Sequence, residues 1–246
     1  MNMTATLLGL GLLSGLMIGC VGIGGVILVP VMTLGIGIPI GTAIAAAMAG
    51  YVLTGITGTL VFGRNGSIRW PLALSLCLGA APGALLGAWA SAAINAHVIE
   101  ILIAALAIAS GLYNLRDKRL AGGSPVPLNT ISFVAIGACV GLLSAVTGTG
   151  GPVILVPLML TFGYPVLTAV GLGQAIQLPV ATLATFGAYT FGSLDIYLSV
   201  LLSLGLAVGS TVGAGVAHHV PRATLRTIAA SVLIATGAFI IYRLVI

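Results

Sequence analysis

Two glycine-rich tracts in this sequence could bind a ligand through the backbone. The first spans residues 22–25 (GIGG) and is followed by a Val-Pro step at residues 29–30. The second spans residues 147–151 (TGTGG) and runs directly into Pro152. Glycine and proline interrupt helices, so each tract should leave unwound backbone between two half helices. Free N–H groups and the partial charge of about +0.5 at a helix N-terminus can together hold an anion without a basic side chain.

We expect the half helices that follow the tracts to begin at Gly25 and at Pro152, because proline loses no hydrogen bond at the first helical position. Thr147 and Thr149 could add hydroxyl donors. The alternative interpretation is that the glycines only allow helices to pack closely. Close packing explains glycine but does not explain two matched breaks flanked by proline, so we favour the anion site.

Two glutamines, Gln174 and Gln177, lie three residues apart inside a long apolar segment and therefore share one helical face. An amide in such a segment needs partners, so it faces the bundle interior or a cavity. The glutamines either join helices by hydrogen bonds or contact the substrate, and we favour substrate because they lie in the segment that follows the second tract. The candidate substrate-binding residues are Gly22, Ile23, Gly24, Gly25, Tyr51, Thr147, Gly148, Thr149, Gly150, Gly151, Gln174 and Gln177.

Ionisable side chains are missing from the middle of every apolar segment. Pumps and proton-driven carriers usually keep a buried carboxylate as a relay, so any proton dependence should come from the substrate itself. The three histidines lie at segment edges, where we interpret them as solvated, and the three cysteines match no metal-ligand spacing. We expect no catalytic residues, no metal and no cofactor; an intramembrane hydrolase would need a nucleophile with a nearby base.

The composition gives the class of protein to which these residues belong. Among 246 residues there are 8 Lys+Arg and 3 Asp+Glu, so 4% are charged and 59% are hydrophobic. Soluble proteins have about 25% charged residues, and this chain cannot cover a water-soluble surface. The pattern indicates a polytopic membrane protein and excludes a soluble enzyme, a nucleic-acid binder and a disulfide scaffold. The net charge of +5 then reports membrane topology rather than a nucleic-acid partner.

Polar residues divide the chain into apolar segments of roughly helical membrane-span length. The segments cover residues 4–36, 40–63, 70–93, 97–115, 128–163, 165–190, 196–217 and 223–243. The first would make a helix of about 50 Å, against a hydrocarbon core of about 30 Å. It and its counterpart at 128–163 must therefore be broken at the glycine tracts. Each is either a hairpin that re-enters from one side or a crossing helix with an unwound middle.

The sequence also contains an internal repeat. A shift of 126 positions places Gly15 on Gly141 and Gly25 on Gly151, and the same register pairs Tyr51 with Gln177. We therefore predict an all-α polytopic membrane helix bundle with two internal repeats, each starting with a Gly-broken helix or re-entrant hairpin. Residues 1–115 form the first repeat, 116–127 a polar linker and 128–246 the second repeat, all within one membrane domain.

The two forms of the broken segment predict different topologies. Hairpins give each half an odd number of crossings, so the repeats are inverted in the membrane and nearly all basic residues lie on one side. Crossing helices give eight crossings and a less uneven division of charge. Basic residues favour the cytoplasm, and both helix length and charge favour the inverted arrangement.

Glycines at four-residue spacing form a stripe in each half, at residues 79–87 and 205–213. This small-xxx-small pattern lets helices approach along their backbones, so we interpret the stripes as packing surfaces. We expect them to cross near the axis that relates the two halves.

Glycine tracts ending in Ile-Leu-Val-Pro at residues 27–30 and 154–157, a following proline and Thr-Ala pair, and the repetition of the whole unit resemble the sulfite exporter TauE/SafE family of permeases. The resemblance covers essentially the whole chain. It implies transport of small sulfur-containing or organic anions across the inner (plasma) membrane by a multi-pass protein.

The predicted function is a secondary transporter of small anions, namely sulfite or an organosulfur or organic anion. An anion channel and a non-transporting membrane subunit of a larger complex are the alternatives. The expected partners are a small anionic substrate and the lipid bilayer, with a homo-oligomer possible and no nucleic acid.

Overall fold

The computed structural model describes residues 3–22, 24–116, 126, 128–190, 194–217 and 222–245. The regular secondary structure within those ranges is entirely helical. The helices are α1 (Met3–Val21), α2 (Gly25–Pro30), the π-helix η1 (Val31–Gly35), α3 (Ile40–Arg64), α4 (Trp70–Ala93), α5 (Ala96–Arg116), α6 (Thr130–Thr147), α7 (Pro152–Thr161), α8 (Val166–Thr190), α9 (Ile196–Val216) and α10 (Arg222–Val245).

Local sequence signals explain where these helices begin and end. The Asn129 side chain accepts a hydrogen bond from the Ser132 N–H at the start of α6, and Asp195 caps α9 through the Leu198 N–H. Gly148 ends α6 in the left-handed conformation that glycine adopts without strain. The helix bounds confirm the apolar segments expected from the sequence, with the two longest segments each divided at a glycine tract. Most of the polar linker, residues 117–125 and 127, lies outside the described residues.

Six helices are long and apolar enough to cross a membrane: α1, α3, α4, α6, α8 and α9, within the residues that the structure describes. Large apolar side chains point outward from them; on α4, for example, Leu74, Leu78 and Trp89 are exposed. A water-soluble bundle would bury these side chains, whereas lipid solvates them. The fold is the polytopic all-α membrane bundle expected from the composition.

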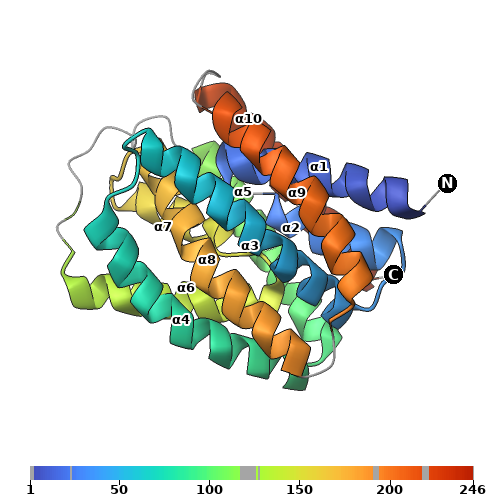
Figure 1. The fold of residues 1–246 in the computed structure, drawn as a ribbon. Helices are drawn as coiled ribbons and strands as arrows, with labels where there is room; N and C mark the ends of the chain where they lie inside the picture. Colours follow the sequence, from blue (N-terminus) through green and yellow to red (C-terminus); the bar gives the residue numbers. More distant parts are fainter. Residues whose placement is uncertain are drawn as a thin grey trace.

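The glycine stripes bring two pairs of helices into backbone contact. A Cβ atom placed on Gly83 would lie 3.0 Å from the Cα of Ala138 on α6, and one placed on Gly209 would lie 2.8 Å from the backbone N of Leu16 on α1. Figure 1 shows α4 and α6 side by side along one edge, with α10 along the opposite edge. The packing interpretation is confirmed. The expected crossing of the stripes is wrong, because each stripe faces a helix of the other half rather than the other stripe.

Helices α3 and α8 occupy the middle of the bundle and pack against each other. Helix α3 also packs against α9, and α8 packs against α4, while α5 and α10 pair with each other. The order of helices is the same in both halves, so that α3 corresponds to α8 and α4 corresponds to α9. Exchanging the halves turns the α3–α9 pair into the α8–α4 pair. The duplication of the sequence, and the division at the linker, stay predictions.

The α6–α7 segment is a hairpin that enters and leaves at one end of the bundle. The N–H of Val126, just before α6, donates to the carbonyl of Phe162, just after α7, at 2.9 Å. The rings of Phe133 and Tyr164 lie edge to face with centroids 6.3 Å apart. The Arg69 guanidinium, in the α3–α4 turn, lies 5.6 Å from the centre of the Tyr164 ring. We call this end, where α3 ends and α4 begins, the arginine end.

The segment formed by α1, α2 and η1 is a hairpin from the other end, which we call the far end. Thr4 Oγ1, at the start of α1, lies 3.3 Å from the hydroxyl oxygen of Tyr197 at the start of α9. Helices α3 and α9 run parallel, since Gly50 lies near Ser203 and Thr57 pairs with Ser210 seven residues later in both helices. Helices α1, α3 and α9 therefore all begin at the far end. The re-entrant hairpin, not the crossing helix, is the form that the chain adopts.

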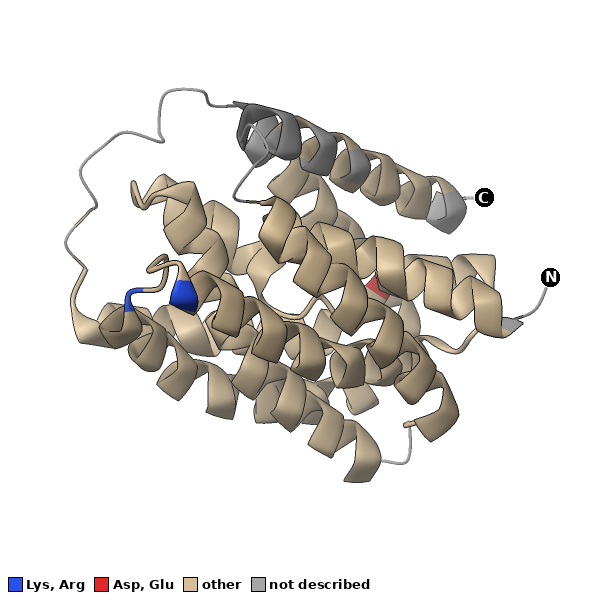
Figure 2. Cartoon of the chain, turned by 45° about the horizontal axis from the view of Figure 1, so that its top comes forward, with Lys and Arg blue, Asp and Glu red and all other residues tan. Residues whose placement is uncertain are grey.

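Basic residues concentrate at the arginine end. Arg64 and Arg69 flank the α3–α4 turn, α5 ends at Arg116 and α10 begins at Arg222. In Figure 2 the blue residues lie together at one end of the bundle, away from the acidic residue in red. The positive-inside rule then predicts that the arginine end faces the cytoplasm.

Candidate functional site

The tips of the two hairpins touch in the interior of the bundle. A Cβ atom placed on Gly25 would lie 2.5 Å from the carbonyl oxygen of Thr149, and one placed on Gly22 would lie 2.9 Å from the Cβ of Pro152. We call Gly22, Gly24 and Gly25 the first tip and residues 148–153 the second tip. Only glycine allows this approach, because any side chain at the contact would overlap the opposite tip.

The two tips differ in backbone conformation. In the first, Gly22 has a φ of +79°, while Gly24 is already helical, with φ of −60° and ψ of −19°, and precedes α2. In the second, Gly148, Gly150 and Gly151 have φ values of +70°, +81° and +105°. The unwound stretch is therefore longer in the second tip. Ile23, which the sequence also proposed for the site, lies outside the described residues.

The second tip leaves backbone donors free at the start of α7. The N–H groups of Gly148 and Thr149 both donate to the carbonyl of Ser144, which closes α6. The N–H groups of Gly150, Gly151 and Val153 make no hydrogen bond within the described part of the chain, and Pro152 has none to make. Helix α7 begins at Pro152 and α2 begins at Gly25, so the predicted start of both half helices is confirmed.

Tyr51 on α3 joins the two tips. Its side chain is fully buried, and its hydroxyl donates to the carbonyl of Gly25 at 3.2 Å. Its ring covers the second tip, since a Cβ atom placed on Gly150 would lie 2.8 Å from Cδ2 of the ring. Tyr51 therefore fixes the first tip through its hydroxyl and the second through its ring.

The two glutamines lie on α8, one face of which packs against the second tip. On that face, a Cβ on Gly173 would lie 3.0 Å from Pro152 Cβ, and a Cβ on Gly151 would lie 3.3 Å from Ile176 Cγ2. Gln174 Nε2 donates to the carbonyl of Ile18 at 2.9 Å, in the last turn of α1. Gln177 Nε2 donates to Thr54 Oγ1 at 2.6 Å, across to α3. Both amides are buried and both join helices by hydrogen bonds, which is the first of the two roles that the sequence left open for them.

The threonine hydroxyls of the second tract have their protons engaged within the protein. Thr147 Oγ1 donates to the carbonyl of Leu143 at 2.7 Å and lies 3.0 Å from Thr149 Oγ1. Because Thr147 has donated its proton, the Thr149 hydroxyl is the donor of this second bond. Both side chains are buried at the site, but neither offers a free hydroxyl proton to a ligand in this conformation.

The structure thus brings together the described residues that the sequence proposed, and it adds two from outside that set. Thr54 on α3 receives the Gln177 amide, and Ser144 lies fully buried in the last turn of α6. The sequence does carry a signal for Thr54, because it lies three residues before Thr57 on one helical face, but a threonine hydroxyl readily bonds its own helix backbone and the signal is weak. Ser144 has no such pattern.

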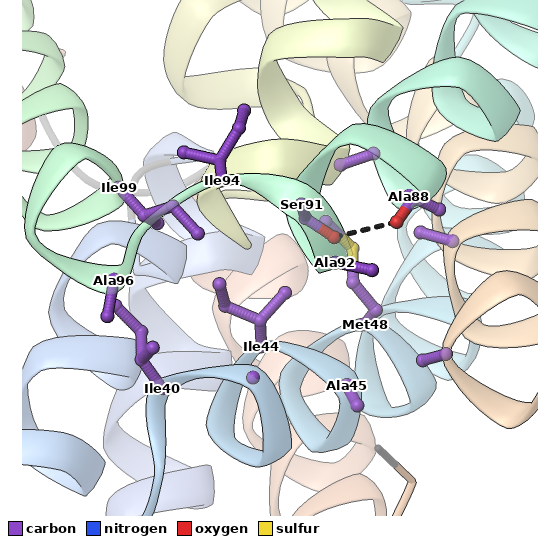
Figure 3. Close-up of a pocket in the computed structure, with 14 residues that line it drawn as sticks. Ile40, Ile44, Ala45, Met48, Ala88, Ser91, Ala92, Ile94, Ala96 and Ile99 are labelled. Atoms are coloured by element: carbon purple, nitrogen blue, oxygen red, sulfur yellow. Dashed lines mark hydrogen bonds between the residues drawn. The ribbon is translucent and has the colours of Figure 1, made fainter. Parts of the chain in front are cut away.

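A cavity of about 300 Å³ reaches from the far end toward the second tip. Figure 3 shows it between the start of α3, with Ile40, Ile44 and Met48, and the end of α4, with Ala88 and Ser91. Ile44 lies at its inner limit, because a Cβ atom placed on Gly148 would lie 2.9 Å from Ile44 Cγ1. The lining is aliphatic apart from Ser91, whose hydroxyl donates to the carbonyl of Ala88.

The corresponding place at the arginine end is filled with side chains. In the repeat register, Ala188 of the cavity wall pairs with Phe62, which is fully buried. A Cβ atom placed on Gly171 would lie 3.0 Å from Ile68 Cγ1 and 3.5 Å from Phe62 Cβ. The tips are therefore approached by a cavity from the far end and covered by packed side chains at the arginine end.

Comparison with known proteins identifies the family. The family model described as Sulfite exporter TauE/SafE matches residues 7–240. The chain belongs to the sulfite exporter TauE/SafE family. The family resemblance seen in the sequence is confirmed, and the match runs through both hairpins and both tips.

A curated relative within the family is named a probable membrane transporter. The chain is 29% identical over 196 residues to "Probable membrane transporter protein YdhB" of Bacillus subtilis (strain 168). The aligned region covers 76% of this chain and 80% of that protein. No solved structure matches the chain. Family, relative and apolar helices together identify a multi-pass membrane transporter, for which the inner membrane is the usual location.

Proposed function

We propose that the protein is a secondary transporter of small anions, sulfite or an organosulfur or organic anion, which it binds between the two hairpin tips. The observation that carries the proposal is the second tip, where free backbone N–H groups of Gly150, Gly151 and Val153 lie at the start of α7 in the buried centre of the bundle. A helix N-terminus with unpaired donors attracts negative charge.

The surroundings strengthen this attraction. The site residues are neutral, so no carboxylate repels an anion, and no basic side chain would hold it so tightly that release becomes slow. In an interior from which water is excluded, backbone dipoles act through a lower effective dielectric than at a surface. A transporter needs this moderate affinity, because the ligand must leave as readily as it enters.

The unequal packing of the two ends supports a transporter over a channel. The cavity approaches the tips from the far end, while Phe62 and Ile68 fill the corresponding place at the arginine end. A carrier with alternating access opens one end at a time, whereas a conducting channel requires a continuous path. The arrangement corresponds to access from the far end. A non-transporting subunit would have no need for two broken helices with their tips in contact.

The experiment is a flux measurement in proteoliposomes that contain only the purified protein. Uptake of radiolabelled sulfite should saturate with concentration and should be inhibited by unlabelled organosulfonates. Flux that rises linearly without saturation would indicate the channel alternative. Absence of flux from folded, correctly inserted protein would contradict the proposal and favour the subunit alternative.

A further inference from the structure

Besides Thr59 Oγ1 on α3, three buried polar atoms lack hydrogen-bond partners within the described part of the chain: Gln174 Oε1, Gln177 Oε1 and Ser144 Oγ. All three residues are at most 1% exposed. Buried polar atoms are almost always satisfied, so each of these atoms requires an explanation. The free N–H groups of the second tip are donors, whereas the amide oxygens can only accept.

The identity of these atoms as oxygens follows from their neighbours. Gln174 Nε2 lies 2.9 Å from the carbonyl oxygen of Ile18, which only accepts, so the amide nitrogen must be on that side. Gln177 Nε2 lies 2.6 Å from Thr54 Oγ1, and Thr54 has already given its proton to the carbonyl of Tyr51 at 3.1 Å. The Thr54 hydroxyl can therefore only accept from Gln177. In both residues the remaining amide atom is the oxygen.

These oxygens lie beside the tips rather than elsewhere in the bundle. The Ile18 carbonyl that holds Gln174 also accepts the N–H of Gly22 at 2.8 Å, so this amide sits where α1 ends. Gln174 Oε1 lies against Gly58, one turn along α3 from Thr54. Gly173 and Ile176, which flank the two glutamines along α8, contact Pro152 and Gly151 of the second tip.

Resting on the proposed function, we propose that the transported ligand is an anion that also carries a hydrogen-bond donor, such as a hydroxyl or ammonium group or the proton of a hydrogen oxyanion. The backbone N–H groups of the second tip hold its negative oxygens. Gln174 and Gln177 accept from its donor, and Ser144 can do either. A fully deprotonated anion with no donor leaves both amide oxygens unsatisfied, so the site discriminates against it.

The test compares ethanesulfonate with isethionate, which has the same sulfonate and the same charge but adds one hydroxyl. Dissociation constants are measured by calorimetry on the purified full-length protein at one pH. We expect isethionate to bind about fivefold to tenfold more tightly, as one additional hydrogen bond would give. Replacing the glutamines, Gln174→Met and Gln177→Met, should reduce this preference, measured as the ratio of the two dissociation constants, toward equality.

Thr185→Val is the matched control, because this α8 hydroxyl donates only to the carbonyl of Ala181 in its own helix, and the preference should persist. If the methionine variants do not fold, the wild-type comparison alone decides. Equal affinities for the two sulfonates would overturn the inference and leave buried water as the partner of the amides, while the proposed function stands. Failure of both sulfonates and of sulfite to bind would contradict the proposed function instead.

Discussion

Gly150 has the backbone geometry that most directly limits substitution at the site. Its φ of +81° lies in the region that β-branched residues avoid, and its Cα faces the ring of Tyr51. Gly150 directly precedes Gly151 and lies three residues before Val153, whose N–H groups make no hydrogen bond within the described part of the chain. Backbone shape at this residue therefore decides whether the donors can reach a ligand.

Gly150→Val should abolish sulfite binding and flux while leaving protein in the membrane. The substitution adds backbone strain of about 1–3 kcal/mol and pushes Tyr51 off the tip. Calorimetry with sulfite and flux in proteoliposomes would measure the effect.

Gly37→Val supplies the matched control for that experiment. Gly37 also has a φ of +81°, but a Cβ atom there would meet nothing within 4 Å. It should lose similar stability and keep sulfite binding. Normal transport by Gly150→Val, or equal loss in both variants, would contradict a site built from the second tip.

At the scale of helices, the glycine stripes set how closely α4 approaches α6 and how closely α9 approaches α1. Lipid offers no hydrophobic driving force for helix association, so these contacts depend on close van der Waals packing between backbones. The stripes hold the hairpin helices α6 and α1 against α4 and α9, and their nearest contacts are not tip residues. Their substitution should affect stability before it affects ligand binding.

Gly83→Ala tests this separation. The added methyl group would meet the backbone of Ala138 and force α4 from α6, at a cost of about 1–3 kcal/mol. The midpoint of thermal unfolding in detergent should fall, while the sulfite dissociation constant of the folded fraction stays unchanged. Gly9→Ala on α1, where nothing lies within 4 Å, should leave the midpoint equal or higher. An unchanged midpoint for Gly83→Ala would show that the helices can separate without cost.

The far-end cavity is also a property of packed helices, because it exists where small residues of α4 and α8 face the start of α3. Ala188→Phe places at this end the residue that fills the corresponding place at the arginine end. Sulfite flux should fall by about tenfold or more, since a barrier higher by about 1.4 kcal/mol is sufficient. Ala105→Phe, at an exposed position on α5, should transport normally. Normal flux through Ala188→Phe would exclude the cavity as the access route.

For the whole molecule, the two hairpins enter from opposite ends, and this fixes the side on which each turn lies. In a variant that lacks the native cysteines, an impermeant thiol reagent added outside intact cells should label Asn95→Cys and Tyr197→Cys. It should not label Asn65→Cys or Thr161→Cys, which lie at the arginine end. All four positions are exposed in the structure.

Thr161→Cys decides between the two topologies. In a chain with crossing helices the turn after α7 would lie on the side opposite Asn65, and in the hairpin arrangement it lies on the same side. Labelling of Thr161→Cys from outside, with Asn65→Cys protected, would therefore contradict the structure. Permeabilised cells, in which all four sites should react, provide the control for reagent access.

The amino-acid sequence by itself determined the class of protein, the helix bounds and the positions of the breaks. These depend on properties that are local in the chain: runs of apolar residues, glycines that allow positive φ, and the missing N–H of Pro152. It also placed Tyr51, Gln174 and Gln177 near the breaks, through the repeat register and helical spacing.

Only the tertiary structure decided how the broken helices return and what their tips contact. The Gln174 amide finds its partner 156 residues away, and the Gln177 amide finds its partner 123 residues away. Local sequence signals cannot specify such pairs, because they depend on which helix faces pack together. The same packing left the glutamine oxygens without partners. The hydroxyl protons of Thr147 and Thr149, by contrast, are engaged by groups nearby in the chain, the Leu143 carbonyl and the Thr147 hydroxyl. Whether a polar atom is free for a ligand depends on its neighbours in space, and these follow from the fold rather than from residue type.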